Sequence, residues 1–256
     1  MENILYYFSG TGNSLAAAQT IAQEMGETRL VSMVHENTED LADDSTIERI
    51  GFVFPVYYGA VPPIVRSFIE NLKLPENIYI FGVITKGGLA GSVQDELAEI
   101  INAAGGKLSY AWTVRMPGNY IAMYPALPDI VQQKLLSSAE RKAETIGEKA
   151  KLKLIDQNIK ADSPPRKSLL QKQPGYLTFA KDYRVHSRCT GCQICAKICP
   201  TKNITMVVGK PHFASNCQHC MACIQWCPMG AITYKERTAN RARYRHPEIK
   251  SEELFR

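Results

Sequence analysis

The eight cysteines of this chain fall into two runs of identical spacing, each ending in Cys-Pro. The pattern C-x2-C-x2-C-x3-C-P is formed by Cys189, Cys192, Cys195 and Cys199, and again by Cys217, Cys220, Cys223 and Cys227. Three thiolates at this spacing can hold one corner of an iron–sulfur cube, whereas the fourth cysteine is too far along the chain to close the same cube. Each proline stops a helix and turns the fourth cysteine toward its cluster. The spacing therefore predicts two [4Fe–4S] clusters.

The two runs form an internal repeat, and their first cysteines are 28 residues apart (217 − 189). In the bacterial two-cluster pattern, the fourth cysteine of each run binds the other cluster. The predicted ligand sets are therefore crossed: Cys189, Cys192 and Cys195 with Cys227, and Cys217, Cys220 and Cys223 with Cys199. The repeat, from near Asp182 to near Lys235, resembles the bacterial two-[4Fe–4S] ferredoxins. In a unit this small, the clusters would supply much of the folding stability.

Two other uses of the cysteines fit the sequence less well. A disulfide framework is typical of small secreted chains, whereas this sequence has 256 residues and no recognisable signal peptide. Structural zinc binds CxxC pairs, but zinc does not explain a third cysteine at the same step and a fourth before proline. Thiolates kept for metal predict a cytoplasmic protein. Because no run of eighteen apolar residues occurs, we expect no membrane span.

The N-terminus carries a second motif. The apolar segment 3–8 predicts a strand, and the helical pattern begins at Leu15. Between them lie Ser9, Gly10, Thr11, Gly12, Asn13 and Ser14. A strand, a hydroxyl-rich loop and a helix N-terminus make an anion site, because free backbone N–H groups converge there with the positive helix end. The loop lacks the lysine of a triphosphate loop and the G-x-G-x-x-G dinucleotide pattern.

Neutral donors around a monoester phosphate suit FMN, and this loop resembles the phosphate loop of the flavodoxin family. The alternative is a simple Ser/Thr helix cap with glycine turns. Apolar runs predict further strands at 28–33, 49–54, 78–85 and 108–115, and helical patterns lie at 63–72, 91–104 and 129–155. This alternation favours a doubly wound α/β sheet. The resemblance implies five parallel strands in the order 2-1-3-4-5, joined to a small α+β two-cluster domain.

Three loops leave the carboxyl ends of the predicted strands, where doubly wound sheets bind ligands. In flavodoxins, the loops after the third and fourth strands hold the isoalloxazine ring. By this resemblance the ring would contact Pro55, Val56, Tyr57, Tyr58 and Gly59 on one edge, Thr85, Lys86, Gly87 and Gly88 on the other, and Asn119 and Tyr120 from the next loop. Tyr57 or Tyr58 would stack on the ring. Its other face would be open, or covered by Tyr120 or Tyr124.

The predicted organisation is a flavodoxin-like FMN domain (1–155), a linker (156–184), a two-cluster ferredoxin domain (185–235) and a basic, solvated C-terminal tail (236–256). The net charge is −6 over residues 1–156 and +11 over residues 157–256, which together give +5. Opposite charges favour docking of the two halves. The alternative use of a basic tail is nucleic-acid binding, which we do not expect here.

Together the parts resemble flavodoxin–ferredoxin fusions, which are electron-transfer proteins of anaerobic bacteria and archaea. The resemblance implies electron transfer between two [4Fe–4S] clusters and FMN, with redox proteins as donors and acceptors. One alternative is an FMN-dependent reductase of a small substrate, although no catalytic residue can be named. Another is a redox-responsive binding module. His186, His212 and His219 are interpreted as packing or surface residues, and Trp226 as a shield for a cluster. The sequence does not decide which cluster lies nearer the flavin.

Overall fold

A computed structural model describes residues 2–34, 41, 46–156 and 182–255. Its first half contains a five-stranded parallel sheet with the order β2-β1-β3-β4-β5, so the predicted doubly wound fold is confirmed. The strands are β1 (Glu2–Tyr7), β2 (Thr28–Ser32), β3 (Ile47–Pro55), β4 (Tyr79–Lys86) and β5 (Leu108–Arg115). Alternate residues of a strand point to opposite faces. In β1, Leu5 and Tyr6 therefore enter the two separate cores that cover the faces of the sheet.

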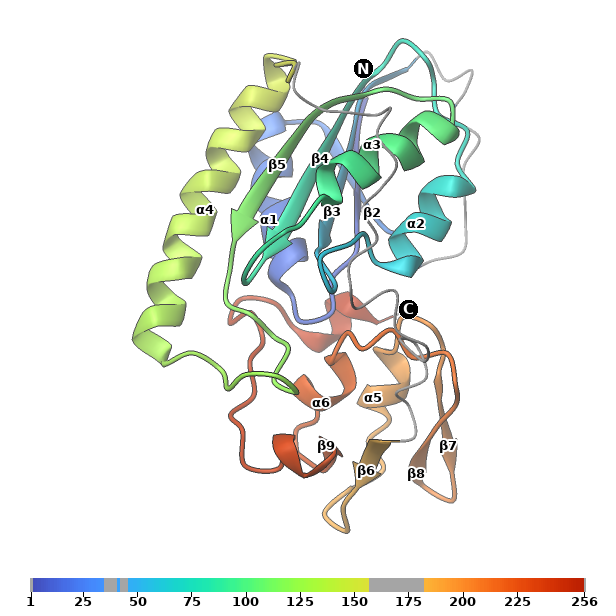
Figure 1. The fold of residues 1–256 in the computed structure, drawn as a ribbon, viewed down its shortest axis with the longest axis vertical. Helices are drawn as coiled ribbons and strands as arrows, with labels where there is room; N and C mark the ends of the chain where they lie inside the picture. The colour runs from blue at the N-terminus through green and yellow to red at the C-terminus, as the bar shows by residue number, and fades with distance from the viewer. Residues whose placement is uncertain (1, 35–40, 42–45, 157–181, 256) are drawn as a thin grey trace.

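Two helices cover each face of the sheet (Figure 1). The helices are α1 (Asn13–Met25), α2 (Pro63–Glu70), α3 (Val93–Ala103) and α4 (Asp129–Lys151). α1 and α4 pack on the face that buries Leu5, Phe81 and Trp112, and α2 and α3 lie over the other face. Among the described helices, none is long and apolar enough to cross a membrane.

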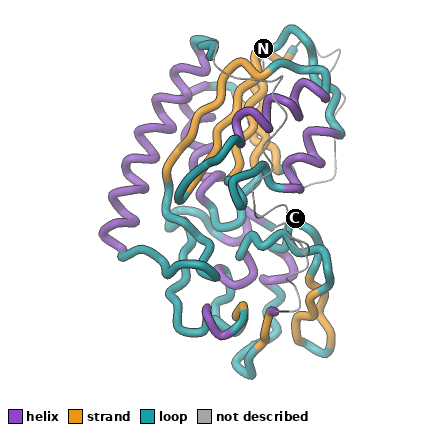
Figure 2. Tube along the Cα trace, in the orientation of Figure 1, coloured by secondary structure: helices purple, strands orange, loops and turns teal. Residues whose placement is uncertain are grey.

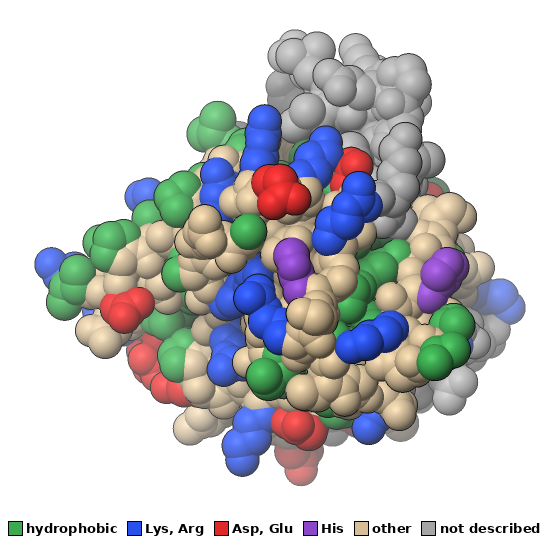
Figure 3. Space-filling model, turned by 90° about the horizontal axis from the view of Figure 1, so that it is seen from below, with side chains coloured by type: hydrophobic (Ala, Val, Ile, Leu, Met, Phe, Trp, Pro, Cys, Tyr) green, Lys and Arg blue, Asp and Glu red, His purple; other side chains and the backbone are tan. Residues whose placement is uncertain are grey.

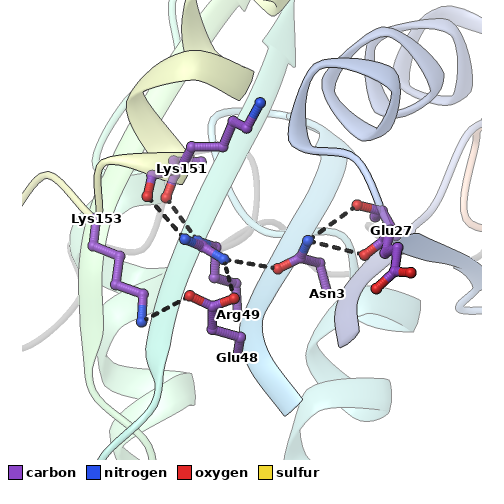
Figure 4. Close-up of polar contacts among 8 residues, drawn as sticks. Asn3, Glu27, Glu48, Arg49, Lys151 and Lys153 are labelled. Carbon is purple, nitrogen blue, oxygen red and sulfur yellow. Dashed lines mark hydrogen bonds and ion pairs between the residues drawn. The ribbon is translucent and has the colours of Figure 1, made fainter. Parts of the chain in front are cut away.

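The long helix α4 ends earlier than the predicted helix over 129–155. Lys153 has a φ of 51°, a left-handed conformation that ends helices. The Arg49 guanidinium of β3 donates to the carbonyl oxygens of Ala150 at 3.1 Å and Lys151 at 2.8 Å, and it also pairs with Glu48 (Figure 4). The sheet thus satisfies the last carbonyls of the helix, which would otherwise lack partners.

The second half forms a small unit at the carboxyl ends of the sheet strands (Figures 1 and 2). It contains two antiparallel strand pairs, β6 (Tyr183–Val185) with β9 (Ile232–Tyr234) and β7 (Ile204–Val207) with β8 (Lys210–Phe213), and two short helices, α5 (Ile194–Lys197) and α6 (Ala222–Gln225). Of the predicted linker, residues 157–181 lie outside the described residues. Ile121 and Ala122, from the loop after β5, are buried in the core of this second unit. The two halves therefore share part of a core.

The backbone of the second unit repeats with the 28-residue period of the sequence. The helices α5 and α6 begin and end at equivalent positions of the two copies. Three equivalent pairs have left-handed φ angles: Gly191 and His219 (72° and 56°), Gln193 and Met221 (66° and 62°), and Lys202 and Gly230 (51° and 55°). The two copies therefore share one backbone conformation at these positions. Two of the pairs contain one glycine each, Gly191 and Gly230, and the third pair contains none.

Residues 239–255 form what we call the C-terminal segment, and the expectation of a solvated tail is wrong for it. Tyr244, His246 and Ile249 are buried. The segment begins directly after the 3-10 turn η2 (Glu236–Thr238) and includes the 3-10 turn η3 (Ser251–Leu254). Ile249 packs with Leu15 of α1, because apolar residues alternate with the basic ones and find a surface between the two halves. The composition of this segment indicated its positive charge but not the burial of its apolar residues.

Gly51, in the middle of β3, provides a test of packing in the sheet. A Cβ at this position would lie 2.2 Å from Leu5 Cδ2 and 2.6 Å from Phe81 Cζ. Gly51→Ala should therefore lower the free energy of unfolding of the first half by about 1–3 kcal/mol, the usual cost of overpacking. Chemical denaturation followed by circular dichroism measures this change. Gly88→Ala is the matched control, because no heavy atom lies within 4 Å of its Cβ position; an equal loss there would contradict the packing explanation.

Candidate functional site

A cavity of ≈ 260 Å³, here called the sheet-end cavity, opens where the loops after β1, β3, β4 and β5 meet. Sixteen of the residues predicted for a flavin site line it: Ser9, Gly10, Thr11, Asn13, Ser14, Pro55, Val56, Tyr57, Tyr58, Gly59, Thr85, Lys86, Gly87, Gly88, Asn119 and Tyr120. Gly12 is predicted for the same site but does not line the cavity. A Cβ at Gly12 would lie 2.8 Å from His246 Cβ, so this glycine admits the C-terminal segment instead.

The loop 9–14 places hydroxyl groups and the N-terminus of α1 at one end of the sheet-end cavity. Gly12 has a φ of 97°, and its N–H donates to Ser9 Oγ at 3.1 Å. Thr11 Oγ1 accepts from the Asn119 amide at 3.2 Å. A hydroxyl that accepts one hydrogen bond still has its own proton to donate. Ser9 and Thr11 can therefore each donate to an anion, together with backbone N–H groups of the first helical turn.

Ser14 and Asn13 are more strongly engaged within the protein than the sequence indicated. Ser14 Oγ lies 2.8 Å from Thr85 Oγ1, so this pair of hydroxyls retains one proton for a ligand. The Asn13 side-chain amide donates to Pro117 O at 2.9 Å, and its oxygen accepts from the Tyr244 hydroxyl at 2.6 Å. Asn13 was predicted as a phosphate donor. In the structure its side chain joins the first loop to the loop after β5 and to the C-terminal segment.

The loop after β3 makes a tight turn at Tyr58 and Gly59. Tyr57 and Ala60 exchange backbone hydrogen bonds of 3.1 and 3.0 Å, and the two residues between them have φ angles of 55° and 79°. Positive φ at both central positions defines a type I′ hairpin turn. A non-glycine residue held there costs about 1–3 kcal/mol. The turn separates the two candidate stacking residues, since Tyr57 packs edge-on against Phe8 in the core while Tyr58 reaches across the cavity wall.

The second unit contributes His219 to the wall of the sheet-end cavity, which the sequence did not predict. His219 Nδ1 lies 2.7 Å from the Tyr58 hydroxyl and 3.1 Å from the Tyr120 hydroxyl, and the two hydroxyls are 2.7 Å apart. Burial lowers the pKa of His219 to about 4, so its imidazole is neutral at pH 7. His219 was interpreted as a packing or surface residue. Its place in the repeat, where the first copy has Gly191, is the sequence signal that could have singled it out.

Further wall residues were also missed. The sheet-end cavity is also lined by residues that were not predicted to contact a flavin: Leu89, Pro117, Gly118 and Met123. Tyr124, which was one candidate to cover the second face of the ring, lines the cavity as well. The loops after β4 and β5 approach closely, because a Cβ at Gly87 would lie only 2.8 Å from Gly118 Cα. Leu89 and Met123 are 94% and 60% exposed, so the rim of the cavity presents apolar side chains to the solvent.

The second cysteine run lies directly against the loop 9–14. A Cβ at Gly10 would be 3.0 Å from the carbonyl oxygen of Cys220, so the two backbones are in close contact. The Trp226 indole N–H donates to Gly10 O at 3.1 Å, and the Asn119 amide donates to Cys220 O at 3.3 Å. The groups that make these hydrogen bonds are neutral, and the Arg245 guanidinium lies over the Trp226 ring, 5.5 Å from its centroid. Trp226 was predicted to shield a cluster, and in the structure its indole also joins the two units.

Two further cavities lie in the second unit, and four cysteines line each of them. Cys199, Cys217, Cys220 and Cys223 line the one beside the sheet-end cavity, here called the inner cavity, and Cys189, Cys192, Cys195 and Cys227 line the outer cavity. These are the crossed sets that the spacing predicts. Among the residues that the structure describes, no three His, Cys, Asp or Glu side chains converge as a single metal ion would require. The thiols instead surround two spaces.

The surroundings of the thiols suit a metal-bound thiolate. Backbone N–H groups point at sulfur in both cavities, from Asn203 to Cys199 Sγ at 3.3 Å and from Ala231 to Cys227 Sγ at 3.2 Å. Burial raises the pKa of Cys195 to about 12 and also raises that of Cys223. Without metal these thiols would stay protonated, so binding of a metal centre must release their protons. Cys192 is exposed, whereas Cys199 and Cys223 are buried, so the outer cavity is the more accessible one.

Comparison with solved structures finds flavodoxins and related flavoproteins. A flavodoxin from the domain Archaea is 17% identical with a TM-score of 0.37, and the alignment covers 59% of this chain and 99% of that one. Two-electron reduced Megasphaera elsdenii flavodoxin is 19% identical (TM-score 0.37; 55% and 98% covered). A Lactobacillus acidophilus flavoprotein in complex with FMN is 16% identical (TM-score 0.37; 44% and 92% covered). No curated protein matches the sequence.

Comparison with protein families gives two separate matches. Residues 4–105 match a flavodoxin domain, and residues 181–228 match a 4Fe-4S dicluster domain. The first match contains the loops after β1, β3 and β4, and the second contains both cysteine runs. The loop after β5 and the C-terminal segment lie outside both matches, although each of them contacts the sheet-end cavity or its first loop.

Tyr244 tests whether the C-terminal segment supports the loop 9–14. Tyr244→Phe removes the hydroxyl that donates to Asn13, and we expect the local free energy of opening to fall by about 0.5–1.5 kcal/mol, the usual worth of one hydrogen bond. Faster amide hydrogen exchange at residues 12–15 would report this loss. The matched control is Tyr79→Phe, which removes a hydroxyl that donates to Leu154 O, outside this loop. Equal exchange in the two variants would contradict the proposed support.

Proposed function

Because the chain joins a flavodoxin domain to a 4Fe-4S dicluster domain, we propose that it is a cytoplasmic electron-transfer protein that passes electrons between two [4Fe–4S] clusters and FMN. FMN would occupy the sheet-end cavity, and the clusters would occupy the inner and outer cavities. A [4Fe–4S] cluster carries one electron at a time and a flavin carries one or two, so their combination supplies a link between one-electron and two-electron chemistry.

One observation carries this proposal: a single short loop forms part of both the inner cavity and the sheet-end cavity. Cys217 and Cys220 line the inner cavity, and His219 between them lines the sheet-end cavity. Cys220 directly follows His219 and Cys217 precedes it by two residues, so the inner cavity lies beside the proposed flavin site. No residue that lines the outer cavity is a sequence neighbour of one that lines the sheet-end cavity. This arrangement supports an order in which the inner cluster lies next to FMN and the outer cluster faces the partner protein.

The donor groups of the chain fit the proposed cofactors. Ser9 and Thr11 and the α1 N-terminus would hold the FMN phosphate through neutral donors, with one further proton from the Ser14–Thr85 pair. Tyr58 and the loops after β4 and β5 would hold the ring. Four thiols around each smaller cavity, with backbone N–H groups directed at sulfur, match what a four-iron cluster requires better than the convergent ligands of zinc.

A redox protein is the expected partner at the outer cavity. Cys192 is exposed there, and two cations lie beside the same cavity. Arg188 donates to Gly230 O at 2.6 Å, and Lys210 Nζ donates to Cys189 O at 2.7 Å. On the face shown in Figure 3, Lys and Arg side chains predominate over acidic ones. A basic surface around an exposed cluster ligand would favour an acidic partner through faster and better oriented association.

The phosphate contacts can be tested with two ligands. Thr11→Ala combined with Ser14→Ala removes hydroxyl donors from the proposed phosphate site. Because a hydrogen bond to a charged group contributes about 1.5–3 kcal/mol, FMN affinity should fall by at least about tenfold. Riboflavin, which lacks the phosphate, should bind almost as well as to the wild type. Fluorescence titration measures both, and equal losses for the two ligands would show that the loop does not hold phosphate.

The crossed ligand sets predict which cluster each cysteine variant damages. Cys199→Ala should remove the cluster of Cys217, Cys220 and Cys223, and Cys227→Ala the cluster of Cys189, Cys192 and Cys195, because each fourth cysteine lines the other cavity. Cluster-resolved EPR of reduced protein, with iron and sulfide analysis, distinguishes these outcomes. The wild type should hold about eight iron ions, as two four-iron clusters require. Loss of the cluster bound by the sequence neighbours would contradict crossing.

Rapid kinetics test the electron-transfer function itself. When the clusters of the loaded protein are photoreduced, flavin absorbance should change at a rate that does not depend on protein concentration, because the two sites are fixed within one molecule. The rate should also persist near 1 M salt, where the Debye length is about 3 Å, because neutral groups make the junction at Gly10. A rate proportional to protein concentration would show that transfer occurs between molecules and would reject the proposed arrangement.

A further inference from the structure

His219 occupies a position where the repeat places a glycine. The equivalent residue of the first copy is Gly191, and both have left-handed backbone conformations, with φ angles of 56° and 72°. Only glycine adopts this conformation without steric cost. The histidine side chain makes contacts at this position that a glycine could not make. These are the contacts of its imidazole with the Tyr58 and Tyr120 hydroxyls in the wall of the sheet-end cavity.

We propose that the inner cluster is a structural part of the FMN site: it holds His219 and the carbonyl of Cys220 in place, so that FMN affinity depends on the inner cluster and not on the outer one. This inference rests on the proposed function, since it takes FMN and the two clusters as the occupants of the three cavities. It adds a dependence between the sites that neither domain has alone.

The loop 217–223 has the properties that such a dependence requires. Three of its seven positions are inner-cavity cysteines, so a cluster would fix the loop at both ends and in the middle. His219 and Met221, on either side of Cys220, have left-handed φ angles of 56° and 62°, which the loop has to maintain. The helix α6, whose first two residues belong to this loop, contains only four residues. Because a metal site rarely forms before its ligands are ordered, binding of the cluster and ordering of this loop are coupled.

The ordered loop in turn completes the sheet-end cavity at two points. His219 closes the wall between Tyr58 and Tyr120, where the sequence provided no aromatic residue from the loop after β4. The Cys220 carbonyl oxygen accepts from the Asn119 amide, which also donates to Thr11 Oγ1 in the proposed phosphate site. Both ends of the FMN site thus contact residues that the inner cluster would hold.

The outer cavity provides an internal control. None of its lining residues is a sequence neighbour of a residue that lines the sheet-end cavity, whereas Gln218 and Cys220 of the inner cavity flank His219. The crossing of the fourth cysteines makes the comparison sharp. Cys199 lies in the first run but lines the inner cavity, whereas Cys227 lies beside Trp226, in the run that touches loop 9–14, but lines the outer cavity. If FMN affinity depends on the inner cavity, substitution of Cys199 should weaken FMN binding and substitution of Cys227 should not. If it depends on closeness along the sequence to the run that touches loop 9–14, the two effects should be reversed.

The experiment measures the dissociation constant of FMN by fluorescence in anaerobically reconstituted full-length protein. In Cys199→Ala, FMN affinity should fall by at least about fivefold, the lower end of ordinary coupling between sites. In Cys227→Ala it should stay at the wild-type value, while iron analysis shows that each variant has lost one cluster. An equal loss in the two variants, or no loss in Cys199→Ala, would overturn the coupling. Absence of FMN binding in the wild type would instead overturn the proposed function, and the coupling with it.

A second variant isolates the side chain of His219 without removing a cluster ligand. His219→Gly reproduces the residue of the first copy at a left-handed position, so the backbone should be retained and iron content should stay at the wild-type value. FMN affinity should still fall by at least about fivefold. Lys202→Gly is the matched control, because Lys202 is left-handed, its repeat equivalent is Gly230, and it does not line the sheet-end cavity. Unchanged FMN affinity in His219→Gly would overturn the role of His219.

Coupling between two binding sites is reciprocal, which provides a test in the unmodified protein. Bound FMN should slow the loss of the inner-cluster EPR signal when the wild type is exposed to an iron chelator. It should leave the decay of the outer-cluster signal unchanged. This measurement does not depend on any variant folding correctly. Equal decay of the inner signal with and without FMN would overturn the proposed coupling.

Discussion

The backbone of Cys220 packs against Gly10, and this contact brings the second cysteine run against the first loop of the sheet. It is possible because Gly10 has no side chain, since a Cβ there would lie 3.0 Å from the Cys220 carbonyl oxygen. The Trp226 indole satisfies the Gly10 carbonyl from the second unit, which removes the cost of burying that oxygen without a partner. Neutral groups make its hydrogen bonds, so close backbone packing and hydrogen bonding contribute to the contact.

The second unit is symmetric in its backbone and asymmetric in what it presents to the sheet. Its two copies share left-handed positions and helix boundaries, as expected for a duplicated pattern of metal ligands. The copies differ where they approach the first half: His219 stands where the other copy has Gly191, and Trp226 where it has Ile198. A symmetric pair of cysteine cavities thereby acquires an inner and an outer member.

Segments outside the two recognised domains complete the junction. Ile121, from the loop after β5, is buried in the core of the second unit. The C-terminal segment returns to the first loop, where His246 N donates to Thr11 O at 2.8 Å and Tyr244 contacts Asn13. These contacts connect the C-terminal segment to the proposed phosphate site. The flavodoxin and dicluster parts are therefore built as one molecule rather than as two independent domains on a tether.

The sequence by itself determined the parallel sheet and the loops at its carboxyl ends, and it predicted the two sets of cysteines that line separate cavities, because strand periodicity and ligand spacing are properties of short segments. The sequence did not show that His219 lines the sheet-end cavity or that Tyr244 is buried within a basic segment. It also did not show that the cavity lined by Cys217 is the one beside the sheet. Each of these depends on how surfaces distant in the chain fit together, and that fit is decided by side-chain shape and close backbone approach. Only the tertiary structure shows which cysteine cavity lies beside the sheet, because the repeat makes the two copies equivalent until one of them packs against Gly10.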